Sequence, residues 1–132
     1  MGCGYGVFGV VIGKLTGAHV DMVDVNLRAM HLAVRNAKEN SVSNVDVFES
    51  NVYENVKSKY STIVTNPPIR AGKKIVYDIV MNAKNHLEKD GKLFLVIRKE
   101  QGAKSLIIDL KKIYNVDILE KSKGFFIIKC SL

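Results

Sequence analysis

The chain has 132 residues, which is enough for one domain with a buried core and too few for two. Its apolar fraction of 47% and its interspersed charges are typical of a globular protein, and no apolar run approaches the roughly 18 residues needed to span a bilayer. Lys and Arg outnumber Asp and Glu by 20 to 13, and the net charge of +7 suits a polyanionic partner such as nucleic acid. A Lys-rich proteome would also give this charge, so charge alone leaves the partner open.

Cysteine and histidine usage indicates an intracellular protein without a metal site. No basic segment precedes the first apolar stretch, so no signal peptide is expected and a cytoplasmic location is predicted. Cys3 and Cys130 lie at opposite ends of the chain and are expected to be reduced thiols. His19, His31 and His86 are scattered, so we interpret them as surface or edge residues and predict no metal ligands.

Short β-rich segments alternate with helical periods along the chain, which predicts an α/β fold with a parallel sheet flanked by helices. Helices are expected at 5–16, after Asn26, at 73–87 and at 101–114. Strands are expected at 19–25, 45–49, 61–65, 92–97, 116–121 and 125–129. No repeat, low-complexity tract or linker interrupts the sequence, so a single domain is predicted over 1–132.

Local signals mark the ends of these elements. Gly17 is the expected C-cap of the first helix, and Asn26 caps the second. Asp90-Gly91 predicts a turn, and Ser122-Lys123-Gly124 predicts a hairpin between the last two strands. The expected inward faces are Leu27, Met30, Val34 and Ala37 in the second helix and Val76, Ile79, Val80, Ala83 and Leu87 in the third.

A glycine motif opens the first helix. The residues from Gly4 to Gly9 satisfy G-x-G-x-x-G, and Asp24 lies twenty positions after Gly4. Glycines let a backbone approach a nucleoside closely, and a carboxylate at the end of the next strand can accept from both ribose hydroxyls. Dinucleotide enzymes and methyltransferases share this pair, and glycines that only permit tight strand-to-helix packing are the alternative.

The sequence Asn66-Pro67-Pro68-Ile69 directly follows a predicted buried strand, at the sheet edge where open α/β folds bind ligands. An amino group conjugated to a ring or a carbonyl is a poor nucleophile because its lone pair is delocalised. The side-chain oxygen of Asn66 and the carbonyl of Pro67 could accept both N–H hydrogens and aim the lone pair at an electrophilic methyl group. A plain strand terminator is the alternative.

These motifs carry a family resemblance. The segments GCGYG, VDVN, SNVYENV and TNPPIRAGK resemble the small-subunit ribosomal RNA guanine-N2 methyltransferase family over nearly the whole chain. The resemblance implies a class I methyltransferase fold, Rossmann-like and mostly parallel with an antiparallel C-terminal hairpin, and S-adenosyl-L-methionine as the cofactor. It also implies that ribosomal RNA or the small ribosomal subunit is the partner.

The resemblance further implies roles for individual residues. The cofactor-binding residues would be Gly2, Cys3, Gly4, Tyr5, Gly6, Asp24, Val25, Asn51, Val52 and Asn66. Asn66, Pro67, Pro68 and Ile69 would form the catalytic loop. The family usually has Ser-Asp where this chain has Ser50-Asn51. The amide oxygen of Asn51 would therefore accept the hydrogen bond from the adenine amino group, without the negative charge of an aspartate. Many relatives have an aromatic residue after the prolines, where Ile69 offers an apolar wall.

Basic residues follow two of the predicted strands. Arg70, Lys73 and Lys74 follow one of them, and Arg98 and Lys99 follow the other. If these strands are parallel neighbours, the five basic groups ring the mouth where an RNA substrate would enter, as phosphate contacts should. An ordinary solvated rim is the alternative. A target base within structured RNA would have to be flipped into the pocket.

The first glycine turn should follow a strand, yet only Met1 precedes it. We therefore expect that the reading frame begins inside a longer gene, or that the chain is a fragment. The expected missing strand would lie centrally, between the strands at 19–25 and 61–65. The family resemblance implies that an acidic residue supporting the methionine amino group would be lost with it.

Four hypotheses follow. The first is an RNA guanine-N2 methyltransferase. The second is a protein glutamine N-methyltransferase, since the same Asn-Pro-Pro chemistry serves an amide nitrogen. The third is a truncated, non-catalytic remnant that binds nucleic acid or a partner chain. A dinucleotide oxidoreductase comes last, because nothing in the chain resembles a hydride-transfer site.

Overall fold

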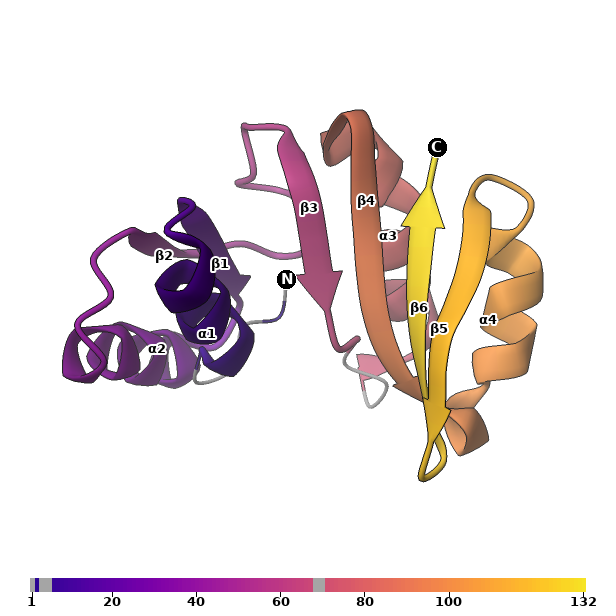
Figure 1. The fold of residues 1–132 in the computed structure, drawn as a ribbon, viewed down its shortest axis with the longest axis horizontal. Coiled ribbons are helices and arrows are strands. Elements are labelled where there is room, and N and C mark those ends of the chain that lie inside the picture. Colours follow the sequence, from indigo (N-terminus) through magenta and orange to yellow (C-terminus); the bar gives the residue numbers. More distant parts are fainter. Residues whose placement is uncertain (1, 3–5, 68–70) are drawn as a thin grey trace. The chain divides into compact units, whose positions relative to one another are not determined.

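The computed structural model describes residue 2 and residues 6–67 and 71–132. Its contacts divide the chain into two compact units, Met1–Val56 (unit 1) and Lys57–Leu132 (unit 2), and each unit has its own sheet (Figure 1). Among the described residues, no helix has the length and apolar character needed to cross a membrane. The single domain expected over the whole chain stays a prediction.

Unit 1 is a pair of parallel strands with two helices. Its elements are α1 (Val7–Thr16), β1 (Val20–Asp24), α2 (Leu27–Glu39) and β2 (Val45–Glu49). The bounds of both strands agree with the sequence prediction to within one residue, and the strands pair in parallel from Val20 opposite Val45 to Asp24 opposite Glu49. The core of this unit joins side chains from every element or its flank: Val10, Met22, Ala33, Ala37 and Val42.

Both helix caps predicted in unit 1 are confirmed. Gly17 takes a left-handed conformation with φ 68°, and its N–H donates to the carbonyl of Gly13. The side chain of Asn26 accepts from the N–H of Ala29 at 3.1 Å, which satisfies one of the free donors at the start of α2. Helix α1 begins at Val7, whereas Tyr5 of the predicted helix lies outside the described residues.

The predicted inward face of α2 is partly wrong. Met30 and Ala37 are buried as expected, but Leu27 is 61% exposed and Val34 is 39% exposed. Ala33 is fully buried in their place. A Cβ on Gly6 would lie 3.0 Å from the Cβ of Ala33, so small residues face each other where the start of α1 meets α2. Because α1 and α2 approach closely at Gly6 and Ala33, the Ala-lined side of α2 faces the core. The larger side chains of Leu27 and Val34 lie beside it and are exposed.

Unit 2 contains a four-stranded mixed sheet. Its strands are β3 (Tyr60–Thr65), β4 (Leu87–Arg98), β5 (Asn115–Ser122) and β6 (Phe125–Ser131), and its helical elements are α3 (Lys73–Asn82), η2 (Ala83–His86), η3 (Lys99–Gln101) and α4 (Ala103–Leu110). The strand order is β3-β4-β6-β5. β3 and β4 are parallel, and β6 is antiparallel to both of its neighbours. The predicted fold class, α/β with an antiparallel C-terminal hairpin, is confirmed.

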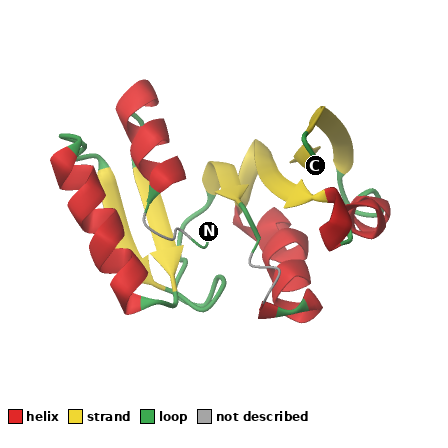
Figure 2. Cartoon of the chain, turned by 90° about the horizontal axis from the view of Figure 1, so that it is seen from below, coloured by secondary structure: helices red, strands yellow, loops and turns green. Residues whose placement is uncertain are grey.

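Helices α3 and α4 lie on the same side of this sheet (Figure 2). The side chains between helices and sheet include Leu93, Leu95 and Ile97 from β4 and Ile128 from β6, each at most 2% exposed. All five inward residues predicted for the third helix are buried. Tyr114 fastens the layers, since its hydroxyl donates to the carbonyl of Val80 at 2.7 Å and accepts from the N–H of Lys84 at 3.0 Å.

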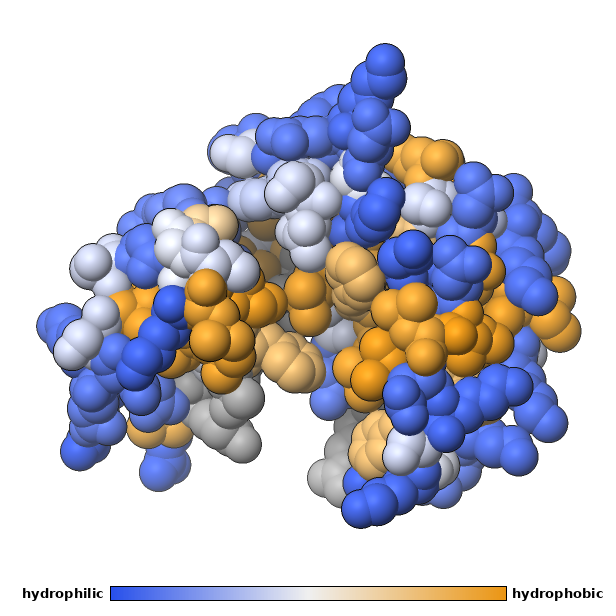
Figure 3. Space-filling view, viewed as in Figure 1, coloured by the Kyte–Doolittle hydropathy of each residue, from blue (hydrophilic) through white to orange (hydrophobic). Residues whose placement is uncertain are grey.

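The opposite face of the sheet carries the half-buried side chains of Phe94 and Val96 and the exposed side chain of Ile127. Figure 3 shows apolar side chains gathered over β4 and β6 on this face. Within the described part of unit 2, neither helix covers it.

Three predicted boundaries in unit 2 need correction. The helix expected at 73–87 ends at Asn82 and continues as the short η2, and the one expected at 101–114 is helical over Ala103–Leu110. Asp90-Gly91 does not end a strand. It forms a bulge inside β4, where Asp90 has φ 66° and the register against β3 shifts. A backbone insertion absorbed by a strand looks like a turn in the sequence.

The predicted hairpin is confirmed. Ser122 pairs with Phe125, which leaves a two-residue turn of Lys123 and Gly124 with φ 49° and 80°. Two successive positive φ values are typical of a type I′ turn, whose twist matches that of the flanking strands.

Candidate functional site

Asp24 stands at the carboxyl end of β1, where its backbone and side chain organise the next turn. The Oδ1 atom accepts from the N–H of Val25 at 2.7 Å and from the N–H of Asn26 at 3.0 Å. The carbonyl of Asp24 accepts from the N–H of Ser50, which follows β2. The carboxylate is therefore fixed at the edge of the sheet beside Val25, an apolar side chain that is 60% exposed.

Ser50 shapes the loop that carries Asn51 and Val52. This serine is 2% exposed, and its hydroxyl donates to the carbonyl of Val52 at 2.8 Å and accepts from the N–H of Asn55 at 3.1 Å. Asn51 is exposed, and Val52 takes a left-handed φ of 56°. A β-branched residue seldom adopts that conformation, so the Ser50 bonds hold a strained loop next to Asp24.

The glycine motif has a packing role at its described positions. A Cβ on Gly6 would meet Ala33, and one on Gly9 would lie 2.1 Å from the Sδ atom of Met22. Both glycines therefore allow α1 to pack closely on β1 and α2, which was the alternative raised from the sequence. Gly2 has φ 63°, and a Cβ there would have nothing within 4 Å. The predicted cofactor residues Cys3, Gly4 and Tyr5 lie outside the described residues.

In unit 2, Asn66 and Pro67 follow β3 directly. Thr65 is fully buried, Asn66 is exposed and Pro67 is buried, so the strand passes from the core to the surface at Asn66. β3 and β4 are parallel neighbours, paired from Thr62 opposite Lys92 onward, and their carboxyl ends lie at one edge of the sheet. The predicted residues Pro68, Ile69 and Arg70 lie outside the described residues.

The other predicted RNA contacts are exposed along that edge. Lys73 and Lys74 open α3, with the Lys73 ammonium 5.2 Å from the ring centre of Tyr77. Arg98 ends β4, lies 5.0 Å from the ring centre of Phe125 and pairs with Glu100 at 3.4 Å. Lys99 follows Arg98. All four of these basic residues are exposed, and their role as RNA contacts stays a prediction.

A hydrogen bond between Tyr77 and Asp109 joins α3 to α4. The Tyr77 hydroxyl donates to the Asp109 carboxylate at 2.5 Å. Burial and then this hydrogen bond raise the pKa of Tyr77 to about 12, and the same bond holds the pKa of Asp109 below its ordinary value. The phenol therefore remains neutral and serves as a fixed donor rather than as a base.

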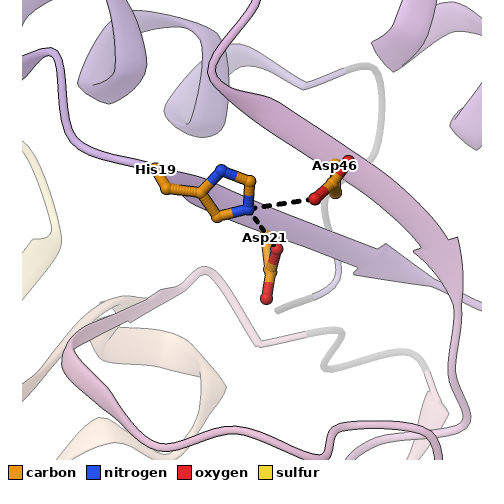
Figure 4. A group of neighbouring side chains, drawn as sticks. All are labelled: His19, Asp21 and Asp46. Carbon is orange, nitrogen blue, oxygen red and sulfur yellow. Dashed lines mark hydrogen bonds and ion pairs between the residues drawn. The ribbon is translucent and has the colours of Figure 1, made fainter.

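The structure also groups three side chains that the sequence left apart (Figure 4). The Nε2 atom of His19 lies 2.9 Å from a carboxylate oxygen of Asp21 and 3.0 Å from one of Asp46. Asp21 and Asp46 are register partners on β1 and β2, where like charges repel, and the imidazole nitrogen lies within hydrogen-bond distance of both carboxylates. Their ligand atoms lie within 4.8 Å of one another, a spacing that would also suit a divalent cation.

Comparison with known proteins identifies the family. The family model of the methyltransferase small domain matches residues 1–129. The uncharacterized protein YbxB of Bacillus subtilis is 41% identical over 98% of this chain, which spans 66% of that protein. The ribosomal RNA small subunit methyltransferase C of Psychromonas ingrahamii is 33% identical over 98% of the chain, which spans 38% of that protein. The chain thus covers less than two thirds of these relatives.

Solved structures agree on the fold. The 16S rRNA N2 G1207 methyltransferase of T. thermophilus, in complex with AdoMet and guanosine, has a TM-score of 0.86 at 21% identity and matches 99% of this chain, which covers 36% of it. A ribosomal protein L11 methylase from Lactobacillus delbrueckii has a TM-score of 0.84 at 21% identity over 98% of this chain, which covers 66% of it. These matches agree with the predicted cofactor, S-adenosyl-L-methionine, and with the resemblance seen in the motifs. By the match over residues 1–129, the chain belongs to the methyltransferase small domain family.

Proposed function

We propose that this chain is the catalytic core of an S-adenosyl-L-methionine-dependent methyltransferase that modifies the exocyclic N2 amine of a guanine in small-subunit ribosomal RNA. The position of Asn66 carries the proposal, because its amide is exposed directly after the buried end of β3, at the edge shared with β4. Family membership and the likeness to ribosomal RNA small subunit methyltransferases C support it.

The carboxyl edge of unit 1 fits the adenosine half of the cofactor. The fixed carboxylate of Asp24 would accept from the ribose hydroxyls, and the exposed amide of Asn51 would accept from the adenine amino group. Val25 and Val52 offer apolar surface for the base. The segment from Gly2 to Gly6 would hold the methionine half.

Asn66 and Pro67 would position the amine that is methylated. When bound, the cofactor supplies an electrophilic methyl group on a sulfonium. The Asn66 side-chain oxygen and the Pro67 carbonyl would accept the two amine hydrogens, so that the nitrogen lone pair leaves conjugation with the ring. Held by the residues of unit 1, the cofactor would give its methyl group to this nitrogen and leave as the neutral thioether, and the amine would lose one proton to solvent.

Residues around the loop would hold the RNA. Ile69 would form an apolar wall beside the flipped base. The basic residues proposed to contact phosphates are Arg70, Lys73, Lys74, Arg98 and Lys99.

Cofactor binding and methyl transfer test the proposal separately. Calorimetry with S-adenosylmethionine should show binding that Asp24→Ala abolishes. Asp46→Ala, which removes a carboxylate at another position of the same sheet, should leave it intact. Transfer of a labelled methyl group to unmodified small-subunit RNA should fall by about 100-fold or more in Asn66→Ala, the loss typical of a transition-state hydrogen bond. Asn82→Ala, an exposed amide at the end of α3, is the matched control.

Each alternative gives a distinct result. Label transferred to a glutamine-containing peptide instead of RNA would indicate the protein methyltransferase. No cofactor binding by folded protein would indicate a non-catalytic remnant.

A further inference from the structure

Four lysines converge on one cavity at the tip of the C-terminal hairpin. The cavity measures about 310 Å³ and is lined by Lys99, Lys104, Lys121 and Lys123, with backbone and aromatic groups of residues 122 and 124–126. We call these four residues the hairpin lysines. No carboxylate lines the cavity, and within the described parts of the chain no ion pair joins a hairpin lysine to an acidic residue. A second cavity of unit 2, of the same volume, has one lysine in its lining.

Backbone pairing and a hydrogen bond hold the hairpin turn against the end of β4. Arg98 pairs with Phe125 across β4 and β6, and the N–H of Lys99 donates to the carbonyl of Gly124 at 2.7 Å. The Lys121 ammonium lies 5.6 Å from the ring centre of Phe126. The hairpin turn is thereby fastened to the end of β4, and Lys104 reaches the cavity from the first turn of α4.

The cavity lies at the same sheet edge as Asn66. The strands β3 and β4 are parallel, and the turn between β5 and β6 lies beside the carboxyl end of β4. β6 and β5 are the second and third strands from β3, so at 4.7–4.9 Å per strand they lie about 10 and 14 Å from it. Each strand of duplex DNA has one phosphate per 3.4 Å of axis. At a comparable spacing, phosphates about three or four nucleotides from the target would reach this cavity in an RNA that runs from Asn66 toward β5.

Charge is concentrated in the same half of the chain. Unit 2 has sixteen Lys and Arg against seven Asp and Glu, a net charge of +9, whereas unit 1 has four against six, a net charge of −2. Clustered ammonium groups without carboxylates repel one another, and a polyanion removes that repulsion while releasing its counterions.

We propose that the hairpin lysines bind backbone phosphates of the RNA substrate that flank the target nucleotide. The proposal rests on the proposed function for its choice of RNA. It adds Lys104, Lys121 and Lys123 to the basic rim. Lysines act as point charges toward phosphate, so these contacts position the strand without reading its sequence.

Salt-dependent RNA binding tests the hairpin lysines. We would measure anisotropy of a labelled 20-nucleotide single-stranded RNA from 50 to 300 mM KCl, with the wild-type chain and a Lys104→Gln, Lys121→Gln, Lys123→Gln triple variant. The triple variant should bind about tenfold or more weakly at 100 mM, and its slope of log affinity against log salt should be shallower by about 2, since each single-strand phosphate contact contributes about 0.7.

A matched triple variant separates this site from net charge. Lys84→Gln, Lys89→Gln and Lys111→Gln remove the same charge from exposed positions outside the cavity lining. This variant should keep the wild-type slope. Equal losses in the two triple variants, or wild-type binding to poly-glutamate as tight as to RNA, would overturn the proposal. S-adenosylmethionine binding measured by calorimetry should be unchanged in both variants.

The outcomes distinguish this inference from the proposed function. RNA binding that depends on the hairpin lysines without any methyl transfer to RNA would refute the proposed function alone. If the wild-type chain methylates RNA, but the hairpin-lysine triple variant binds RNA as tightly as the control triple variant, the phosphate site alone would be refuted.

Discussion

At the scale of single residues, the space around position 91 admits only a glycine. Gly91 sits in the bulge of β4, where an added Cβ would lie 2.8 Å from the carbonyl oxygen of Glu88 and 3.0 Å from that of Tyr60. Both atoms belong to the backbone, so neither can move aside as a flexible side chain would.

We therefore expect Gly91→Ala to lower the free energy of unfolding by about 1–3 kcal/mol, the usual cost of overpacking. Gly17→Ala is the control, because its Cβ would have nothing within 4 Å and only the left-handed φ is strained, at about 1 kcal/mol. Urea unfolding of both variants measures the difference. Equal losses would mean that crowding at Gly91 is relieved by backbone movement.

Cys130 is the second residue whose surroundings define its chemistry. It is fully buried in β6, and burial raises the pKa of its thiol to about 12, against 9.0 in the unfolded chain. Burial also raises the pKa of Tyr114 from 10.0 to about 12. Both groups are neutral when protonated and negatively charged when ionised, and burial disfavours the charged form. The folded state therefore binds these protons more tightly than the unfolded state does.

The sign of the pH dependence follows. Stability from these groups is fully present below about pH 9 and is lost as pH rises toward 12, because the unfolded chain ionises first. Urea midpoints between pH 7 and 11 should fall, and the fall should begin at higher pH in Cys130→Ala, where only the contributions of Tyr114 and Tyr77 remain. An unchanged onset in Cys130→Ala would contradict the assignment to this thiol.

At the scale of elements, the loop after β2 depends on one hydroxyl. Ser50 bonds to Val52 and Asn55 and so holds a valine at a φ of 56° beside Asp24. Without these bonds the loop can relax out of the strained conformation.

Ser50→Ala should cost about 1–2 kcal/mol of stability, because it leaves the N–H of Asn55 and the carbonyl of Val52, both in part-buried hydrogen bonds, without this partner. It should also weaken S-adenosylmethionine binding, since Asn51 and Val52 lose their fixed positions. Calorimetry and urea unfolding measure the two effects, with the exposed Ser43→Ala as the matched control. Lost stability with unchanged cofactor affinity would show that Asn51 and Val52 do not need this loop conformation to serve the site.

Local signals explain which elements the sequence predicts correctly. Gly17, Asn26 and the Lys123-Gly124 turn act through neighbouring backbone, so caps, strands and hairpin follow from short segments. The end of β3 at Thr65 follows from the prolines of Asn66-Pro67-Pro68, which cannot extend a strand, although β3 is only partly buried.

Cross-strand register explains what the sequence does not predict. His19 meets Asp46 only because β1 and β2 pair in one register, and Lys121 comes near Lys99 only because the hairpin is fastened to β4. Ala33 replaces its larger neighbours because Gly6 allows a close approach between helices. Such contacts depend on partners far away in the sequence, which periodicity within one element does not reveal.

At the scale of the whole chain, charge separates the two units. Unit 2 carries +9 and unit 1 carries −2, although their combined charge gives no hint of this division. Long-range attraction of a polyanion should therefore be directed to unit 2.

Ultraviolet crosslinking to RNA checks this expectation. Crosslinked peptides identified by mass spectrometry should come mainly from unit 2, and their yield should fall as KCl rises from 50 to 300 mM, because the attraction is screened. The yield of crosslinked peptides should also fall when a polyanionic competitor is added. Equal yields from both units would show that charge does not direct the RNA.

The hairpin turn carries a conflict that would become visible under selection. Lys123 adopts a φ of 49° in a type I′ turn, a position that favours asparagine or glycine, and its side chain lines the proposed phosphate site. Lys123→Asn should stabilise the hairpin while removing a charge. Libraries of this chain enriched for heat resistance should therefore drift to asparagine at position 123, whereas libraries enriched for RNA capture should keep lysine. One residue would then record which of the two demands shaped the sequence.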